Sequence, residues 1–340
     1  MKKVLITGGA GFIAHHIIAH IIKNTDWDIV TLDRLDLSGN LNRLHEILYE
    51  FSAKDKKRLK VVFHDLKAEI NSQIKSELGT PDMILHLAAA SHVDRSIIYP
   101  MEFVLDNVVG TVNLLDFARS LKNLEKFVYF STDEIFGNAP EGVSYKEYDR
   151  YNSTNPYSAS KASAEEFCVA YENTYKLPII ITHTMNVFGE RQHPEKFIPM
   201  TIQRVRDSEK VFIHANKEKT KAGSRHYIHA QDVADGLMFI LGLKNYKHEG
   251  DFGNAKCPKF NLVGPEEINN LDLAQKIAEV QKKELIYELI DNHTSRPGHD
   301  LRYSLSPNLL KSLGWEPKIK LSKRIEEVVD WSLKNKRWLS

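Results

Sequence analysis

Short apolar runs alternate with longer amphipathic stretches through the first half of the chain. Each run is apolar at consecutive positions, which is typical of strands covered on both faces of a parallel sheet. The stretches between them, such as 13–23 and 104–121, repeat their apolar residues with a helical period. The pattern predicts strands at 4–6, 29–32, 61–63, 83–85, 127–130 and 179–182. We therefore expect an α/β fold with a Rossmann-type, doubly wound parallel sheet.

This alternation ends near residue 182. The stretch 183–225 is rich in loop-forming residues and includes the lysine-dense segment 217–221. Helical periods return at 230–243, 270–283 and 322–334. We predict a Rossmann domain over 1–182, with 226–245 returning to it. The segments 183–225 and 246–340 are predicted to form a smaller C-terminal α/β lobe that binds the substrate.

Composition narrows the class of protein. The 46 Lys and Arg residues nearly balance the 45 Asp and Glu residues, which argues against a protein that binds nucleic acid or membrane surfaces through excess cations. Two cysteines, Cys168 and Cys257, cannot build a disulfide framework or close a structural zinc site alone. No apolar run approaches the ~18–20 residues of a membrane span. We expect a cytoplasmic protein without a metal.

A glycine-rich segment, TGGAGFIA at 7–14, follows the first predicted strand and opens the first predicted helix. Gly8 permits a tight turn, and Gly11 lets the backbone approach a pyrophosphate at the helix N-terminus. Alone, the motif is also compatible with an ordinary glycine turn.

Two acidic strand ends strengthen the prediction of a dinucleotide site. Asp33 ends the second strand, where a carboxylate accepts hydrogen bonds from the ribose hydroxyls and repels a 2′-phosphate. This favours NAD, although Arg34 follows immediately and leaves NADP as the alternative. Asp65 and Leu66 end the third strand, where a loop reaches the adenine.

Tyr157 and Lys161 are four residues apart on a predicted helix that begins at Pro156, so both project from one helix face. A phenol has a pKa of ~10, and an adjacent ammonium group stabilises its anion. Such a phenol can exchange a proton with a carbinol during hydride transfer. The same spacing also occurs by chance.

Ser131, Thr132, Asp133 and Glu134 follow the strand 127–130. The S-x-x-E pattern is a helix capping box, but a glycine and a proline follow too closely for a helix to propagate. The alternative is a hydroxyl and two carboxylates at the carboxyl end of the sheet, where such folds bind ligands. Two carboxyl groups in different surroundings can act as acid and base in one turnover.

Taken together, these motifs resemble the extended short-chain dehydrogenases/reductases, and specifically the dTDP-glucose 4,6-dehydratases. The matching pieces span nearly the whole chain in the order of that family. They are TGGAGFI (7–13), SHVDRSI (91–97), DN (106–107) with GT (110–111), STDEIFG (131–137), YSASKAS (157–163), PEKFIP (194–199) and RPGHDLRYSL (296–305).

The resemblance implies a reaction on a nucleoside-diphosphate hexose. Bound NAD accepts a hydride from C4 while Tyr157, assisted by Lys161, removes the O4 proton and Thr132 hydrogen-bonds O4. Glu134 then removes the C5 proton, Asp133 protonates the departing C6 hydroxyl, and the hydride returns to C6. The product is a 4-keto-6-deoxy sugar nucleotide, an intermediate of deoxysugar biosynthesis.

The resemblance also implies two sets of binding residues. The cofactor set is Gly8, Gly11, Phe12, Ile13, Asp33, Arg34, Asp65, Leu66, Leu87, Ala88, Ala89, Ser91, Asp106, Tyr157 and Lys161. The substrate set is Ser91, Thr132, Asn186, Lys196, Phe197, Arg225, Asn261, Arg296 and His299. It further implies a homodimer in which helices 104–120 and 157–175 form a four-helix bundle with a second copy.

Four departures from the family pattern leave the nucleotide base open. Ala90 replaces a usual Glu, His183 a usual Arg and Val187 a usual Asn, and 223–227 lacks the usual R-D-W. We expect dTDP-glucose as the substrate, with UDP- or GDP-linked hexoses as alternatives. A sugar-nucleotide 4-epimerase is the second enzymatic hypothesis, and an NAD-binding regulatory scaffold is the non-enzymatic one.

Overall fold

The computed structural model describes residues 1–36, 38–244, 246, 248–249, 255–291 and 300–340. They form two compact units, each assembled from discontinuous stretches of the chain. Unit 1 comprises Met1–Ile135, Asn155–His183 and Leu237–Phe260, and unit 2 comprises Phe136–Thr154, Thr184–Gly236 and Asn261–Ser340.

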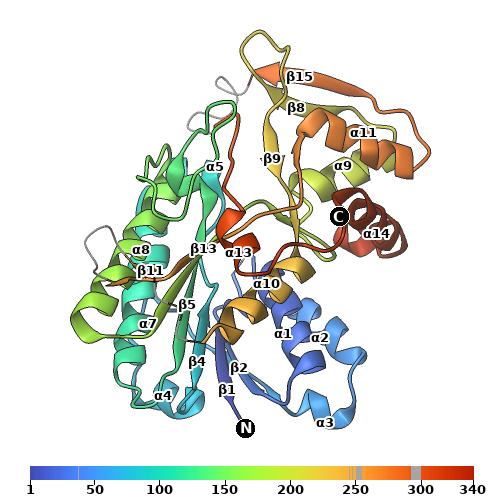
Figure 1. The fold of residues 1–340 in the computed structure, drawn as a ribbon. Helices are drawn as coiled ribbons and strands as arrows, with labels where there is room; N and C mark the ends of the chain where they lie inside the picture. The colour runs from blue at the N-terminus through green and yellow to red at the C-terminus, as the bar shows by residue number, and fades with distance from the viewer. Residues whose placement is uncertain (37, 245, 247, 250–254, 292–299) are drawn as a thin grey trace. The chain divides into compact units, whose positions relative to one another are not determined.

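A seven-stranded sheet forms the core of unit 1 (Figure 1). The strand pairs β2–β3, β1–β2, β1–β4 and β4–β5 are parallel. All the predicted strands are present, and the predicted doubly wound α/β fold is confirmed. In spatial order the strands are β3 (Leu59–Phe63), β2 (Asp28–Asp33), β1 (Lys3–Thr7), β4 (Met83–His86), β5 (Lys126–Thr132), β6 (Ile179–Thr184) and β13 (Lys259–Leu262).

Helices cover both faces of this sheet (Figure 1), which explains why its strands are apolar throughout. Leu114 of α7 and Cys168 of α8 pack in one buried cluster with Ile84 and Phe127 of the sheet. Among the described residues, no helix combines the length and apolarity needed to cross a membrane. The helices of unit 1 are α1 (Phe12–Asn24), α2 (Leu41–Tyr49), α3 (Ala53–Lys56), α4 (Ser72–Leu78), α5 (Val93–Ile98), α6 (Pro100–Phe103), η1 (Val104–Val109), α7 (Gly110–Arg119) and α8 (Pro156–Tyr175).

Unit 2 is built on short strand pairs and three longer helices. Strands β7–β10 and β8–β15 are parallel, and β9–β14 is antiparallel. Helices α9, α11 and α14 contribute Ile202, Leu273, Ile325 and Val329 to one buried cluster. The elements are β7 (Val187–Phe188), α9 (Phe197–Arg206), β8 (Val211–Ala215), β9 (Ser224–His226), β10 (Ile228–His229), β14 (Glu267–Asn269), α11 (Asn270–Val280), β15 (Tyr287–Asp291), α13 (Asn308–Ser312), α14 (Leu321–Lys334) and η3 (Lys336–Trp338).

Along the chain, η2 (Asp133–Phe136) and α10 (Ala230–Gly242) cross from one unit to the other, and β11 (His248–Glu249) and β12 (Ala255–Lys256) lie within the segment 237–260 of unit 1. The unit boundaries differ from the predicted domains in two places. Residues 136–154 belong to unit 2, because the backbone of Tyr145 exchanges hydrogen bonds of 3.0 and 2.8 Å with Ser304 and Ser306. The returning segment of unit 1 is 237–260 rather than 226–245, and within it Pro258 O accepts a 2.9 Å bond from the Ile181 amide.

The predicted helix 104–120 is interrupted in its first half. Residues 104–109 adopt the wider π-helical geometry of η1, and α7 continues from Gly110. The π turn carries Asp106 and Asn107, whose side chains reach other loops of unit 1. Single π turns inside α-helices are frequent at functional sites, and this one adjoins the cavity described below.

A cluster of buried charges lies between α8, β6 and β13. The fully buried carboxylate of Glu165 lies 2.7 Å from Lys259 Nζ and 3.2 Å from His183 Nε2. Burial opposes the charged form of Glu165, but His183 and Lys259 hold its pKa well below the usual range. His183 therefore occupies the core, and its departure from the family pattern does not bear on the nucleotide base.

We expect Lys259→Met to destabilise the protein by about 3 kcal/mol, because Glu165 keeps its charge in the core without its ammonium partner. The double variant Glu165→Met, Lys259→Met should recover part of this loss. Lys60→Met is a matched control, since it removes an ion pair with Glu77 that is about half exposed, and should cost less than about 1 kcal/mol. Urea unfolding measures all three, and equal effects of Lys259→Met and Lys60→Met would contradict the expectation.

Candidate active site

The glycine loop between β1 and α1 brings two backbone segments into close approach. Gly8 has φ +70°, and a Cβ there would lie 3.0 Å from the backbone of Ala88. A Cβ on Gly11 would lie 2.7 Å from Gly8 O, so a larger residue would fill the turn. Gly11 caps α1 without a side-chain hydrogen bond, which leaves the first N–H groups of the helix available to an anion.

Asp33 ties the end of β2 to this loop. Its carboxylate accepts hydrogen bonds of 2.9 Å from the Ala10 amide and 2.8 Å from the Leu35 amide. Leu35 has φ +56°, so the chain turns sharply here and the carboxylate stays beside the glycine loop. One carboxylate therefore shapes the loop at the position where a ribose is bound in Rossmann folds.

Most predicted cofactor residues surround one cavity at the carboxyl ends of β1, β2, β3 and β4 in unit 1. They are Gly8, Gly11, Asp33, Arg34, Asp65, Leu66, Leu87, Ala88, Ala89 and Asp106. Phe12 and Ile13 open α1 and do not line the cavity. Ser91, Tyr157 and Lys161 also do not line it, because Ser91 follows the β4 loop and the other two lie on α8.

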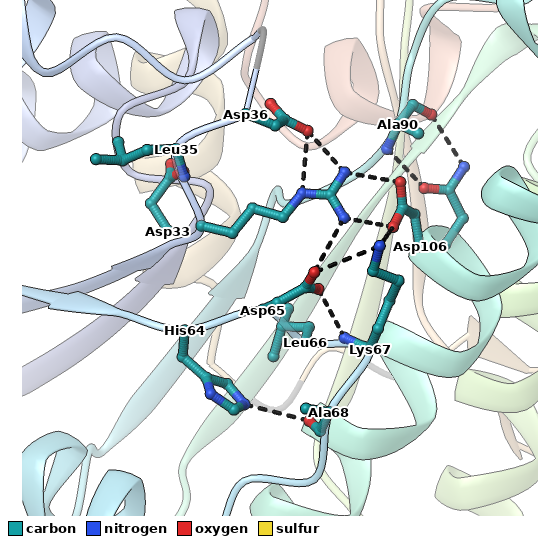
Figure 2. A network of polar contacts seen from close by, with 12 residues as sticks. Asp33, Leu35, Asp36, His64, Asp65, Leu66, Lys67, Ala68, Ala90 and Asp106 are labelled. Atoms are coloured by element: carbon teal, nitrogen blue, oxygen red, sulfur yellow. Dashed lines mark hydrogen bonds and ion pairs between the residues drawn. The ribbon is translucent and has the colours of Figure 1, made fainter.

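Six lining residues are absent from the sequence prediction, namely Leu32, Asp36, Ser38, Gly39, His64 and Ala90. The backbone of Gly39 lies close to the Asp33 carboxylate, because a Cβ on Gly39 would lie 3.0 Å from Asp33 Oδ1. The polar segment 36–39 directly after an acidic strand end is a signal that sequence reasoning could have used. Figure 2 shows these strand-end loops meeting around Asp33, Asp65 and Asp106.

The five predicted catalytic residues all belong to unit 1. Thr132 ends β5, Asp133 and Glu134 form the 3₁₀ turn η2, and Tyr157 and Lys161 lie one turn apart at the start of α8. Asn155 accepts a hydrogen bond from the Ser158 amide in a capping box, and Pro156 occupies the first turn. These features begin α8 at a defined residue and therefore set the position of the phenol.

Tyr157 and Lys161 lie in surroundings that oppose their charged forms. Burial, then the negative charge of Glu134, raises the pKa of Tyr157 well above its usual value, and a hydrogen bond with Thr132 lowers it in part. Burial lowers the pKa of Lys161 to about 8, and its ammonium donates a 2.6 Å bond to Phe130 O. Stabilisation of the Tyr157 anion by Lys161 stays a prediction.

The two carboxylates of the η2 turn have different surroundings. Asp133 is buried and accepts a 3.1 Å hydrogen bond from Thr132 Oγ1. Glu134 is half-buried and accepts a 3.3 Å bond from the Asn155 amide nitrogen. Two carboxyl groups in different surroundings are thus held beside one hydroxyl.

A buried asparagine links the cavity to α8. Asn107 in the π turn donates to Ala90 O at 3.0 Å and to Ser160 Oγ at 2.9 Å, and it accepts a 2.8 Å bond from the Ala90 amide. The loop after β4 and the helix that carries Tyr157 are therefore held by one side chain.

The predicted substrate residues other than Ser91 and Thr132 fall in unit 2 or outside the described residues. Asn186 is exposed, and Lys196 and Phe197 begin α9. Arg296 and His299 lie outside the described residues. Contact of these side chains with a substrate stays a prediction.

Arg225 and Asn261 bind backbone carbonyls within unit 2. Arg225 donates to Leu301 O at 2.6 Å and Asp300 O at 2.8 Å, and its guanidinium lies 4.6 Å from the centre of the Tyr303 ring. Asn261 is buried, and its amide nitrogen donates to Tyr145 O and Ser306 O at 3.1 and 3.3 Å. Substrate binding by Asn261 would require new partners for these carbonyls.

Comparison with known proteins decides the family. A family model described as GDP-mannose 4,6 dehydratase matches residues 5–328. The chain belongs to the GDP-mannose 4,6 dehydratase family. This confirms the resemblance to extended short-chain dehydrogenases/reductases and the prediction of an enzyme of the sugar-nucleotide 4,6-dehydratase class.

Individual relatives of this family member carry the same class of activity. A dTDP-glucose 4,6-dehydratase from Salmonella typhimurium is 34% identical, over 99% of this chain and 94% of that protein. The crystal structure of a dTDP-glucose 4,6-dehydratase from Bacillus anthracis in complex with NAD has a TM-score of 0.84 and 27% identity, over 99% of this chain and 98% of the other.

An epimerase shares the fold of this dehydratase family member almost as closely. The crystal structure of UDP-glucose 4-epimerase from Thermus thermophilus in complex with NAD has a TM-score of 0.82 and 26% identity, over 97% of this chain and 98% of the other. Similarity of fold alone therefore does not separate dehydration from epimerisation, whereas the family model and the curated relative name dehydratases.

The low pKa of Lys161 predicts how stability depends on pH. Below pH 8 the folded and unfolded chains both carry the proton, whereas between pH 8 and about 10.5 only the unfolded chain does. Lys161 therefore adds stability as the pH rises through this window, by about 1.4 kcal/mol per pH unit. In Lys161→Met this gain should be absent when urea unfolding is compared at pH 7, 8, 9 and 10.

The exposed Lys221→Met variant is the matched control and should keep the wild-type dependence on pH. If wild type and Lys161→Met showed parallel stability curves from pH 7 to pH 10, the buried ammonium would not be the source of the slope.

Proposed function

We propose that this protein is an NAD-dependent dehydratase that converts dTDP-glucose to its 4-keto-6-deoxy derivative. The observation that carries the proposal is the placement of Asp133 and Glu134 in one turn beside Thr132, close enough for both carboxylates to raise the pKa of Tyr157. Epimerisation at C4 needs only a base for the O4 proton, whereas loss of water across C5 and C6 needs an additional acid and base.

The residues around the cavity of unit 1 fit a dinucleotide. A Cβ at Gly8 or Gly11 would fill the turn, the N-terminus of α1 is open to a pyrophosphate, and Asp33 offers a carboxylate to a ribose. The expectation of NAD agrees with the NAD complexes of the solved relatives. When bound, NAD accepts a hydride from the sugar, returns it, and carries a positively charged nicotinamide ring.

In the proposed reaction Tyr157 takes the O4 proton. Its buried phenol lies near two carboxylates, so a positive charge beside it is required before it can act as a base near neutral pH. Thr132, whose hydroxyl donates to Asp133 at 3.1 Å, hydrogen-bonds O4 as the resemblance implies. Lys161, held by Phe130 O, adds a positive charge within the same helix turn.

The acid and base roles of the η2 turn follow the resemblance and are consistent with the surroundings. Glu134, half-buried and oriented by Asn155, removes the C5 proton. Asp133, buried and hydrogen-bonded by Thr132, protonates the leaving C6 hydroxyl. Lys196 and Arg225 supply cations suited to a diphosphate, and the resemblance adds Arg296, which lies outside the described residues.

Incubation with dTDP-glucose, UDP-glucose, GDP-mannose and CDP-glucose tests the proposal. We expect dTDP-glucose to lose one water by mass spectrometry, without net NADH formation. Loss of water from another nucleotide sugar alone would retain the reaction and correct the base. An unchanged mass with inversion at C4 would identify an epimerase.

Glu134→Gln should slow the loss of water by about 100-fold or more, because the amide cannot accept the C5 proton. Glu69→Gln is the control, since Glu69 is exposed and does not line the cavity of unit 1. Dehydration at the wild-type rate by Glu134→Gln would remove this residue from the mechanism.

The proposal includes a homodimer formed by helices 104–120 and 157–175. It is supported by apolar side chains on these elements that are more than a third exposed, namely Val104 (39%), Leu105 (41%), Phe167 (42%) and Tyr175 (45%). Large apolar side chains exposed on the same two helices are expected at an interface between protein chains.

Light scattering at micromolar concentration should give a mass of twice 39.0 kDa. The double variant Leu105→Asp, Phe167→Asp should be monomeric, because both aspartates would have to be buried without a partner at the interface. Phe212→Asp, at a 41% exposed position of β8, should leave the mass unchanged. A wild-type mass of 39.0 kDa would contradict the dimer.

A further inference from the structure

Arg34 is the residue that leaves NADP open in the sequence, and the structure shows where its charge goes. An arginine beside the adenosine ribose accommodates a 2′-phosphate in NADP-binding Rossmann folds. Arg34 lines the cavity of unit 1 directly after Asp33, and its side chain is 28% exposed. Its position alone therefore favours NADP, in opposition to Asp33.

The guanidinium of Arg34 is already occupied by three carboxylates. Its two terminal nitrogens donate to the two oxygens of Asp106 at 2.5 and 2.8 Å, which is a bidentate pair. Nε and Nη2 donate to Asp36 at 3.0 and 2.6 Å. Nη1 also lies 3.5 Å from Asp65, so all the donor nitrogens of the fork face carboxylate oxygens.

A second cation near this site is neutralised in the same way. Lys67 Nζ lies 3.4 Å from Asp65 and 3.7 Å from Asp106. Figure 2 shows Asp36, Asp65 and Asp106 converging on one guanidinium, with Lys67 beside them. Among the cavity-lining residues, the four carboxylates of Asp33, Asp36, Asp65 and Asp106 face the single guanidinium of Arg34. Arg43, close by, donates to the backbone carbonyls of Ala10 and Ser38. A group with nearly two negative charges would therefore meet carboxylates that already share the charge of Arg34.

The three aspartates come from separate elements of unit 1. Asp36 lies in the loop after β2, Asp65 in the loop after β3, and Asp106 in the π turn η1. Asp106 is only 10% exposed, so its charge depends on Arg34 and Lys67 for compensation. Release of Arg34 toward a phosphate would leave this carboxylate buried with a weaker partner.

We infer that Asp36 and Asp106 are specificity-determining residues, which select NAD over NADP by holding Arg34 away from a 2′-phosphate. The inference rests on the dinucleotide site of the proposed function and deepens it. Discrimination thus comes from two sources, the carboxylate of Asp33 and an arginine that is neutralised by its own neighbours.

Binding of adenosine 5′-monophosphate and adenosine 2′,5′-bisphosphate tests this inference without any catalytic step. Calorimetry on the purified protein, after removal of bound dinucleotide, gives the ratio of the two dissociation constants. Wild type should prefer the monophosphate. In Asp36→Asn, Asp106→Asn the ratio should move toward the bisphosphate by about tenfold or more, because Arg34 gains free donors for the 2′-phosphate.

Adding Arg34→Ala to the double variant should remove this gain, since the attraction comes from the guanidinium. Asp36→Asn alone should give a smaller shift in the same direction and leaves the π turn intact. The charge-matched control is Asp26→Asn, Asp116→Asn, because both residues are exposed and neither lines the cavity; its ratio should equal that of wild type.

Three outcomes would overturn one or the other of two statements. An unchanged ratio in Asp36→Asn and in the double variant, with monophosphate binding retained, would overturn the role of the two aspartates and leave the NAD site standing. A shift that persists after Arg34→Ala would also overturn it. Failure of wild type to bind the monophosphate, NAD or NADP would instead overturn the proposed cofactor.

Discussion

Burial of the parallel sheet on both faces is the constraint on which the rest of unit 1 depends. Strand interiors must be apolar, so polar chemistry is confined to the strand ends and to groups that pair within the core. Thr7 Oγ1 lies 2.7 Å from His86 Nδ1, and His86 Nε2 lies 2.9 Å from Thr111 Oγ1. Burial, then the charge of Lys161, lowers the pKa of His86 to about 3. The hydrogen bonds of His86 with Thr7 and Thr111 therefore join β1, β4 and α7 without adding a charge. The same threonine also positions the loop after β4 that lines the cavity, because Thr7 Oγ1 accepts a hydrogen bond from the Ala88 amide.

What the sequence predicts well is local in the chain. Apolar runs locate the strands, and the glycine spacing locates the turn at Gly8, because both depend on neighbouring residues. Contacts between distant residues could not be predicted. Arg34 and Asp106 are 72 positions apart, and Glu165 and Lys259 are 94 apart. The π turn was also beyond prediction, since the sequence of 104–120 has an ordinary helical period and the widening depends on tertiary contacts.

The surroundings of Tyr157 and Lys161 oppose the charged form of each side chain. Burial and nearby carboxylates favour the neutral form of Tyr157. Burial also lowers the pKa of Lys161 to about 8, so its ammonium loses the proton more readily than an exposed lysine. The Lys161 ammonium donates to a backbone carbonyl, Phe130 O. A positive charge that arrives with a ligand would favour the phenolate, and the capped start of α8, with the Tyr157 amide donating to Ser96 Oγ at 3.1 Å, fixes the position of the phenol beforehand.

The meaning of a charged residue at a binding site depends on what already neutralises it. In the sequence, Arg34 after Asp33 indicates a site for a 2′-phosphate. His183 in place of the usual arginine indicates a changed site for the nucleotide base. In the structure the first is held by aspartates and the second lies in the core beside Glu165. Both residues are therefore read correctly only with their partners, since a guanidinium with its donors in use gains little from a new anion. Selectivity for the dinucleotide then belongs to a network of acids and bases that no single position reveals.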